Sequence, residues 1–380
     1  MKELSEGRIL IVDDTRANVD ILVAALRDDY KLSVALSGES ALQSIERSRP
    51  DLVLLDILMP GIDGFEVCRR LRAAPATREL PIMFLSSLEE AKDKAKGFEL
   101  GGNDYVTKPF ELLEVQARVR SLLKAKAYSD AVKEKMASEL RIAREIQLGI
   151  LPAGLAATVA GTGFEIATLL EPAREIGGDL YEVVRTDDGR LVVVIGDVSG
   201  KGIPAALFMA VTVTLVRTMA QRYRAPDEIV FQVSEALARQ NPQDMFVTLF
   251  CAVFVPGQER VECASAGHPS LALARPGAPP SLPVAPTAPV AGFERGTTVG
   301  RRSIDVRPGD RVVLYTDGVT EAMDEGDRLF GDERMLAELA RQPGASAAET
   351  VAGLAEAVRA FVGKREASDD LAIVALRRSS

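Results

Sequence analysis

The sequence is poor in the residues that soft metal ions and nucleic acids require. It has one histidine and three cysteines, too few for a conventional zinc site with imidazole and thiolate ligands. The formal net charge is −9 and no basic stripe is present, which argues against nucleic-acid binding. Cys68, Cys251 and Cys263 have no paired spacing, which is typical of buried thiols in a reducing compartment.

Long apolar runs are also missing. Residues 1–6 form no apolar signal region, and no uncharged run approaches the roughly 20 residues that a membrane-spanning helix needs. We therefore expect a cytoplasmic protein that does not bind membranes. The 380 residues, 47% of them hydrophobic, are enough for two domains with a core each.

The first part of the chain, residues 1–123, alternates short apolar strands with helical patterns. Expected strands are 8–14, 31–35, 52–56, 81–85 and 104–107, with helical spacing over 19–26 and 39–47. This alternation predicts an α/β doubly wound, parallel five-stranded sheet with helices on both faces. Ligands of such sheets bind beyond the carboxyl ends of the strands. The polar residues expected there are Asp13, Asp14, Asp56, Ser86 and Lys108.

These five side chains suit phosphoryl transfer. Asp13 and Asp14 can hold Mg²⁺, and Asp56 can accept a phosphoryl group whose oxygens Ser86 and Lys108 would bind. A cis peptide before Pro109 would fix the lysine, since X–Pro bonds adopt the cis form at low cost. Each residue alone is more simply a solvated charge or a helix cap, but all five at strand ends favour a phosphoacceptor site.

This region resembles the receiver domain of response regulators. The matching segments are Val12-Asp13-Asp14, the run from Leu54 to Gly64, Leu85-Ser86-Ser87 and the run from Tyr105 to Phe110. The resemblance implies that a sensor histidine kinase phosphorylates Asp56, with Mg²⁺ on Asp14, Asp56 and the Leu58 carbonyl. It also implies that Ser86 and Tyr105 couple phosphorylation to a change of the surface.

Residues 124–152 predict a helical linker. Its apolar stripe, with steps of mostly three and four, consists of Tyr128, Val132, Met136, Leu140, Ala143, Gln147 and Ile150. Pro152 ends the pattern. The stripe could pack on the chain's own second domain or pair two chains in a short coiled coil. We favour the coiled coil, and hence a homodimer, because a helix between two domains has little else to cover its stripe.

The remainder, residues 153–380, has longer strands and glycine-rich turns. Strands are expected at 164–170, 181–184, 191–198, 247–255, 260–266, 311–316 and 371–376, and helices at 203–220, 226–239 and 348–362. Grouped strands between long helices predict an α/β sandwich, with sheet packed on sheet and helices outside. The proline-rich stretch 275–290 is expected to be a loop.

Four acidic motifs stand at strand boundaries in this second domain. They are Gly177-Gly178-Asp179, Gly196-Asp197-Val198, Thr316-Asp317-Gly318 and Ser368-Asp369-Asp370. One such aspartate is usually a turn residue, but four in this order predict a carboxylate cage for Mg²⁺ or Mn²⁺. Two ions about 3.5–4 Å apart would activate a water molecule and clamp a phosphate.

Roles within this cage follow from the neighbours of each carboxylate. The glycines around Asp197 let the backbone approach and expose the Val198 carbonyl, so Asp197 is expected to bridge the two ions. Asp317 and Asp369 would complete one metal shell, and Asp179 would serve the other.

The ordered set resembles the metal-dependent PPM-family phosphatases of the SpoIIE-like branch, over residues 160–377. The resemblance implies that metal-activated water hydrolyses phosphoserine or phosphothreonine, and that Arg174 binds the substrate phosphate; a surface salt bridge is the alternative for this arginine. It also implies that Asp369 is the ligand, with Asp370 as a polar neighbour of the metal centre. Glu182 stands where many relatives carry aspartate, outside the direct ligands.

Two further residues have a sharper and a plainer interpretation. His268 could be a general acid, but bracing of the adjacent Gly-Pro turn is favoured. Lys201 could orient substrate, but a solvated turn residue is the simpler view.

Taken together, the motifs predict a response regulator whose Asp56 phosphorylation controls a metal-dependent phosphatase. The resemblance implies a phosphorylated STAS-type anti-sigma-factor antagonist as substrate. The alternative is an adaptor that binds and sequesters a signalling partner without turnover. Such an adaptor would be expected to have lost a metal-binding carboxylate, and none of the four motifs has lost its aspartate.

Overall fold

The computed structural model describes residues 7–86, 91–239, 241 and 243–379, and it divides into two compact units, Met1–Ser138 and Glu139–Ser380. The division falls inside the expected linker. The six N-terminal residues and Ser87, on which parts of the sequence argument rest, lie outside the described residues.

The first unit is built on a parallel sheet with the strand order β2-β1-β3-β4-β5, as the alternating pattern predicts. Its strands are β1 (Arg8–Val12), β2 (Lys31–Ala35), β3 (Leu52–Asp56), β4 (Ile82–Ser86) and β5 (Asp104–Thr107). Its helices are α1 (Arg16–Leu26), α2 (Gly38–Arg47), α3 (Gly64–Ala73), α4 (Ala91–Glu99) and the first part of α5 (Leu112–Ile150).

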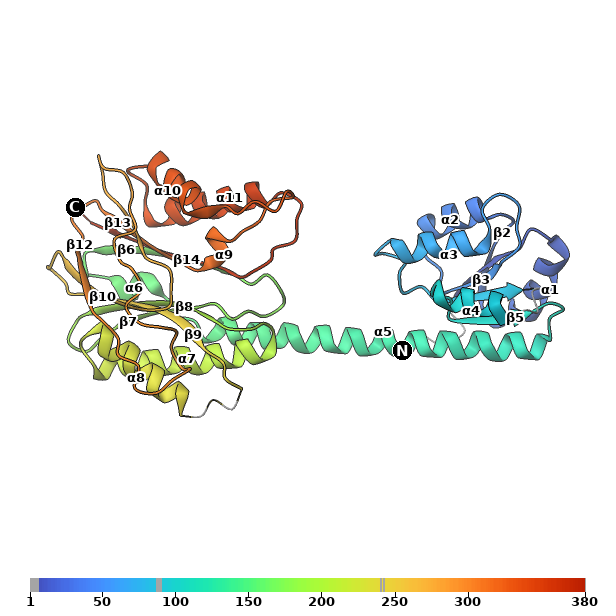
Figure 1. Ribbon diagram of the computed structural model, residues 1–380, viewed down its shortest axis with the longest axis horizontal. Coiled ribbons are helices and arrows are strands. Elements are labelled where there is room, and N and C mark those ends of the chain that lie inside the picture. The colour runs from blue at the N-terminus through green and yellow to red at the C-terminus, as the bar shows by residue number, and fades with distance from the viewer. Residues whose placement is uncertain (1–6, 87–90, 240, 242, 380) are drawn as a thin grey trace. The chain divides into compact units, whose positions relative to one another are not determined.

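Two apolar layers cover the faces of this sheet. On one face, α1 and α5 pack through residues such as Leu22, Val115 and Val119. On the other face, α2 and α3 pack through residues such as Ile45 and Leu71 (Figure 1). All three cysteines of the chain are free and buried, as expected for small core residues.

The second unit contains two antiparallel sheets, one ordered β12-β10-β9-β8-β7 and the other β11-β13-β14-β6. Its strands are β6 (Phe164–Glu171), β7 (Leu180–Arg185), β8 (Leu191–Val198), β9 (Val247–Phe254), β10 (Arg260–Ala266), β11 (Ala272–Ala274), β12 (Arg302–Asp305), β13 (Arg311–Tyr315) and β14 (Leu371–Arg378). Its helices are α6 (Leu155–Val159), α7 (Ile203–Arg222), α8 (Pro226–Ala238), α9 (Asp317–Thr320), α10 (Gly331–Arg341) and α11 (Ala347–Val362).

These elements form the predicted α/β sandwich. The two sheets lie between the helix pair α7 and α8 on one side and the pair α10 and α11 on the other (Figure 1). Val312, Val374 and Leu376 of the four-stranded sheet share one core with the five-stranded sheet, whereas α10 and α11 cover a separate core. The short elements α6, α9, α10, β11 and β12 were not predicted from the sequence.

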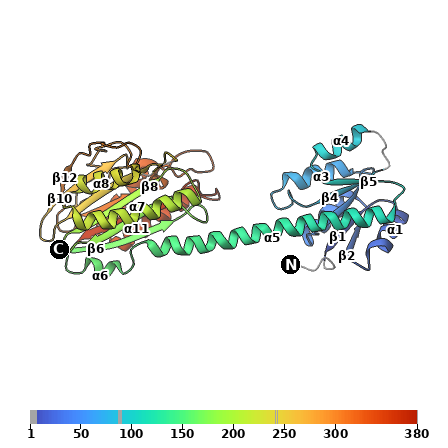
Figure 2. The same ribbon diagram turned by 90° about the horizontal axis from the view of Figure 1, so that it is seen from below.

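Helix α5 begins at Leu112 and continues without a break through the expected linker to Ile150 (Figure 2). The two ends of the expected apolar stripe differ in their exposure to solvent. Tyr128, Val132 and Met136 are exposed, whereas Gln147, which belongs to the second unit, is only 4% exposed and donates to the Gly177 carbonyl.

By length and composition alone, two helical segments could cross a membrane: Leu112–Val159, which includes α5 and α6, and Ile203–Arg222. This is weak evidence, because a core helix of a soluble protein passes the same test. Helix α7 indeed contributes Met209, Val213 and Val216 to the core of the sandwich.

Candidate functional site

The first candidate site lies at the carboxyl ends of β1, β3 and β5. The ammonium group of Lys108 lies 2.7 Å from a carboxylate oxygen of Asp13 and 2.7 Å from one of Asp56. Asp13 and Asp56 are buried and Asp14 is exposed. The Lys108–Pro109 peptide is cis, as expected. The sheet therefore brings together the charged groups that the sequence assigned to one pocket.

This acidic pocket has the donor set of a magnesium site. Oxygen atoms of Asp13, Asp14 and Asp56 lie within 4.8 Å of one another. Burial raises the pKa of Asp56 although Lys108 opposes this, so a second cation beside the carboxylates would favour their charged forms. Asp56 also accepts a hydrogen bond from the backbone N–H of Leu58, at 3.3 Å, which places that residue of the loop beside the pocket.

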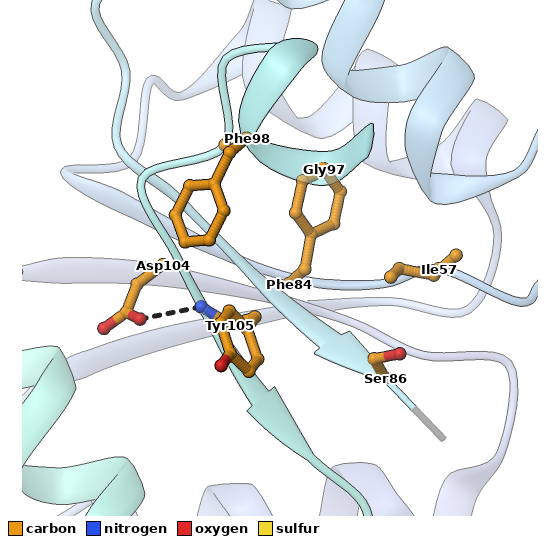
Figure 3. A pocket seen from close by; sticks show the side chains of 8 residues that line it. Ile57, Phe84, Ser86, Gly97, Phe98, Asp104 and Tyr105 are labelled. Atoms are coloured by element: carbon orange, nitrogen blue, oxygen red, sulfur yellow. Dashed lines mark hydrogen bonds between the residues drawn. The ribbon is translucent and has the colours of Figure 1, made fainter. Parts of the chain in front are cut away.

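Ser86 and Tyr105 line a neighbouring pocket at the ends of β4 and β5 (Figure 3). Ser86 is buried, and the Tyr105 ring meets the Phe98 ring edge to face with centroids 5.8 Å apart. The backbone N–H of Tyr105 donates to Asp104, at 2.8 Å. The two residues thus connect the phosphoacceptor end of the sheet to α4, the helix that carries Phe98.

The second candidate site is built by four segments of the sandwich. Asp179 directly precedes β7, Asp197 lies in β8, Asp317 opens α9, and Asp369 lies two residues before β14. Their carboxylates interact electrostatically: Asp197 with Asp179, Asp317 and Asp369, and Asp317 with Asp369. The fold therefore brings the four predicted aspartates into one electrostatically coupled group, although they are up to 190 residues apart in the sequence.

Glycines make this convergence possible. A Cβ atom on Gly178 would lie 2.8 Å from the Val198 carbonyl oxygen and 3.4 Å from a carboxylate oxygen of Asp197. A Cβ on Gly177 would lie only 2.0 Å from a carboxylate oxygen of Asp370. The loop before β7 can therefore approach the end of β8 only because it lacks side chains here.

Repulsion among the carboxylates of the cage favours the binding of cations. Burial, and then the charge of Asp197, raises the pKa of Asp179 well above the ordinary aspartate range. Burial and the charges of Asp317 and Asp369 raise the pKa of Asp197 to about 7. Acidic groups that disfavour each other's ionisation are stabilised by divalent metal ions, and an all-oxygen donor set suits Mg²⁺ or Mn²⁺. The residues present therefore fit a metal centre.

The two carboxylates of the motif Ser368-Asp369-Asp370 have different surroundings. Asp370 is buried and accepts hydrogen bonds from the backbone N–H groups of Ala173, at 2.8 Å, and Gly178, at 2.7 Å. Asp369 is exposed and lies at the pocket that Arg174 and Lys201 also line. Asp370 is therefore the anchor of the loop before β7, whereas Asp369 stays exposed at the pocket.

Two cationic side chains stand at this pocket. Arg174 is exposed, and Lys201 donates to the Ser368 carbonyl at 2.7 Å and lies 3.3 Å from Asp369. Positive charge at the mouth of an acidic cage is suited to holding a phosphate anion next to metal ions. Lys201 is exposed, which agrees with a solvated turn residue, and it also pairs with a candidate metal ligand.

His268 connects two strands that lie next to the site. It is buried, one ring nitrogen lies 3.0 Å from the Tyr315 carbonyl, and the other lies 2.8 Å from the Thr248 hydroxyl. The first nitrogen must donate to the carbonyl, so the second accepts from the threonine. Burial lowers the pKa of His268 to about 3, which keeps it neutral near pH 7. His268 thus has a bracing role, but its ring links Thr248 of β9 to Tyr315 of β13 and not the adjacent Gly-Pro turn that the sequence indicated.

Sequence reasoning missed two threonines that hold the cage. The Thr316 hydroxyl donates to Asp179 at 2.7 Å and accepts from the Ala372 N–H at 3.1 Å. The Thr248 hydroxyl accepts from the Asp197 N–H at 3.2 Å. The position of Thr316 directly before a predicted ligand was a weak signal of its supporting role. Thr248 gave no such signal, because the pairing of its strand with the strand of Asp197 is known only from the fold.

Comparisons with known proteins agree with this division. Residues 187–379, just over half of the chain, match the family described as Stage II sporulation protein E (SpoIIE), and residues 9–120 match the response regulator receiver domain. The SiaA-PP2C domain of Pseudomonas aeruginosa superposes with a TM-score of 0.58 at 22% identity, over 65% of this chain and 98% of that one. At that identity the likeness shows the fold.

Curated relatives match mainly through the receiver region. Response regulator PleD of Caulobacter vibrioides is 37% identical over 48% of this chain and 40% of its own length. The regulatory protein PhoP of Bacillus subtilis is 43% identical over 31% of this chain and 48% of its own length. The chain thus spans less than half the length of either relative. The chain belongs to the SpoIIE family through its second unit, which shares the fold of the SiaA-PP2C domain, and its first unit matches the response regulator receiver domain.

Proposed function

We propose that this protein is a response regulator in which phosphorylation of Asp56 controls the hydrolysis of phosphoserine or phosphothreonine on another protein. The electrostatic coupling of Asp179, Asp197, Asp317 and Asp369 carries the proposal, because grouped carboxylates offer the oxygen ligands that hard cations prefer. No nucleic acid enters this function.

Each residue of the cage has a distinct task in the proposed reaction. Asp197 and the Val198 carbonyl would be shared by two ions, Asp317 and Asp369 would hold one of them, and Asp179 would hold the other. When bound, two Mg²⁺ or Mn²⁺ ions supply an activated water molecule and neutralise charge on the phosphate. Arg174 at the rim of the pocket orients the phosphate, and Asp370 holds the loop that carries Arg174 and Asp179.

The receiver domain supplies the control. A sensor histidine kinase is its proposed phosphoryl donor, and Asp14, Asp56 and the Leu58 carbonyl are the proposed Mg²⁺ ligands. Lys108 contacts Asp56 directly and is placed to bind the transferred phosphoryl group. Ser86 and Tyr105 then pass the change to the surface around α4.

The substrate and the setting rest on family resemblance. In SpoIIE-like partner switching the phosphoprotein is a STAS-type anti-sigma-factor antagonist, which we propose as the substrate. We propose a cytoplasmic protein, since both unit types act in soluble signalling. A homodimer through α5 is proposed because Tyr128, Val132 and Met136 form an exposed apolar row on that helix.

Removal of the bridging carboxylate tests the enzyme. Asp197→Ala is expected to abolish Mn²⁺-dependent release of phosphate from a phosphorylated STAS protein, while Asp187→Ala, an exposed aspartate of the same domain, retains it. Undiminished turnover in Asp197→Ala would move the metal centre elsewhere. Wild-type protein that binds the phosphoprotein without turning it over would favour the sequestering adaptor.

A second assay tests the control by Asp56. Beryllofluoride, which mimics an aspartyl phosphate, is expected to change both turnover and oligomer size of the wild type. An Asp56→Asn variant is expected to be insensitive to it. Identical values for the wild type with and without beryllofluoride would count against regulation by the receiver.

A further inference from the structure

A cavity of about 360 Å³ lies beside the acidic cage of the phosphatase domain. Its walls come from the end of β6, the segment that follows α9, the end of α11 and the loop before β14. Pockets that bind small ligands in proteins have volumes of about 300–1,000 Å³. The cavity is therefore large enough to take a side chain of another molecule.

This cavity adjoins the pocket at which the substrate phosphate is proposed to bind. Ala173, Ser368 and Asp369 line both the cavity and the smaller pocket that Arg174 also lines. Asp369 is in addition one of the four aspartates of the cage. An extended chain advances about 3.3–3.6 Å per residue, so the residues within about three positions of a bound phosphoserine stay within about 11 Å of it. Such residues are in range of a cavity that shares these walls.

Apolar side chains form much of the wall of the cavity. Val358 and Leu371 are buried, whereas Met323 and Val362 are half-buried and keep part of their surface open. Moving an apolar side chain from water into such surroundings is favourable, roughly in proportion to the apolar area that is covered. The cavity is therefore suited to an apolar side chain, although the cage beside it is strongly acidic.

Most of the charged groups that line the cavity are already paired within the domain. Arg359 of α11 forms an ion pair with Glu171 at the end of β6. Arg365 donates to the carboxylate of Asp327 at 2.6 Å. Glu366 is exposed, so water and salt screen its charge. With these charges compensated, apolar contact is the main interaction that the cavity offers to a substrate.

We propose that this cavity is a specificity pocket, which takes an apolar side chain of the phosphoprotein located within about three residues of the phosphorylated serine or threonine. Met323 and Val362 are the pocket residues expected to contact that side chain. The inference rests on the proposed function and deepens it by naming a feature of the substrate. The cage can bind the phosphate of any phosphoprotein, whereas the pocket distinguishes one phosphoprotein from another.

Synthetic phosphoserine peptides test the pocket on the full chain with Mn²⁺. Each peptide has alanines around the phosphoserine and a single leucine within about three positions on either side, and an all-alanine peptide is the reference. The readout is the ratio of kcat/KM for a leucine peptide to kcat/KM for the alanine peptide. A ratio of about 10 or more is expected at one of these positions, since even one methylene group in an apolar pocket changes kcat/KM by about 10–200-fold. The absence of a leucine preference at every position would overturn the proposal.

Two variants assign the leucine preference to the cavity. Met323→Ala and Val362→Ala each remove apolar contacts and are expected to lower the leucine ratio by about 3-fold or more. Because the ratio compares two peptides on the same protein, a general effect of the substitution on the metal centre cancels. Leu329→Ala is the matched control, because Leu329 pairs with Met323 through a backbone bridge but is 46% exposed and does not line the cavity. A leucine ratio that stays at the wild-type value in both pocket variants would refute the proposal.

The same peptides separate this proposal from the proposed function. A lysine peptide that is hydrolysed better than the leucine peptide would show selection by the acidic groups and would contradict an apolar pocket. If neither nitrophenyl phosphate nor any phosphopeptide releases phosphate, the proposed function fails, and fluorescence anisotropy of labelled peptides with Mn²⁺ still decides the role of the cavity. Tighter binding of the leucine peptide that is lost in Met323→Ala would support the pocket, and equal affinity for the leucine and alanine peptides would overturn it.

Discussion

Thr316→Val removes a hydroxyl from the centre of the metal cage while nearly preserving the volume of the side chain. The hydroxyl donates to Asp179 at 2.7 Å and accepts from the Ala372 N–H at 3.1 Å, and Thr316 is fully buried. A hydrogen bond to a charged group contributes about 1.5–3 kcal/mol, and an unpaired buried N–H costs about 1–3 kcal/mol. Because the two effects share one site and are not additive, we expect the free energy of unfolding to fall by about 2–4 kcal/mol.

The same change should also weaken metal binding. Asp179 loses the group that fixes its carboxylate, so the Mn²⁺ affinity of the phosphatase centre is expected to fall by about 10–100-fold. Urea unfolding measures the first effect, and Mn²⁺ titration of turnover measures the second. Thr316→Ser keeps the hydroxyl and should remain near wild type in both. Equal stability and equal Mn²⁺ dependence in the valine and serine variants would refute this reasoning.

Two further predictions concern the supports of the cage. Gly177→Ala places a methyl group 2.0 Å from the Asp370 carboxylate, so the free energy of unfolding should fall by about 1–3 kcal/mol and most turnover should be lost. The matched variant Gly149→Ala has open space around the new Cβ atom and should instead stabilise the helix by about 0.5–1 kcal/mol. Equal stability and equal turnover of the two alanine variants would show that Gly177 does not lie this close to Asp370. The pKa of His268 is lowered by burial to about 3, below its ordinary 6.5, so between these values only the unfolded chain binds the proton. The free energy of unfolding must therefore fall as the pH drops below 6.5, by up to about 1.4 kcal/mol per pH unit from this residue, and His268→Gln should flatten that slope between pH 6.5 and 5. An unchanged slope in the variant would show that the histidine is not buried in its neutral form.

The sheet and the acidic pocket of the receiver domain could be predicted from sequence, whereas helices α3 and α4 were not predicted. Fully buried parallel strands such as β3 appear as continuous apolar runs, and their ends are marked by the first polar residue, here Asp56. The chemistry is concentrated at those ends, so finding the strands also locates the pocket. Helix α5 was the exception: its receiver part and the expected linker have no break between them, because Leu112 to Ile150 contains no proline.

The strands and acidic motifs of the phosphatase domain could be predicted, but the side chains that hold the aspartates in place could not. Asp179 and Asp197 stand next to glycines, and this pairing signals close backbone approach. Thr248 supports Asp197 from a neighbouring strand, and no local pattern identifies which strand that will be. Gln147 was taken as one member of an apolar stripe, although an amide in such a stripe signals a buried hydrogen-bond partner.

The energetics of the cage explain why the supports of the Asp179 loop matter for metal binding. The pKa of Asp197 is raised to about 7 by burial and neighbouring aspartates, so the carboxylates resist convergence unless cations hold them together. Placement of the Asp179 loop therefore decides whether the cage can bind metal at all. A pair of hydrogen bonds contributes about 1–3 kcal/mol, and every 1.4 kcal/mol changes an affinity tenfold. The pair of hydrogen bonds by which Asp370 holds this loop is thus sufficient for a change of about 10–100-fold in metal affinity.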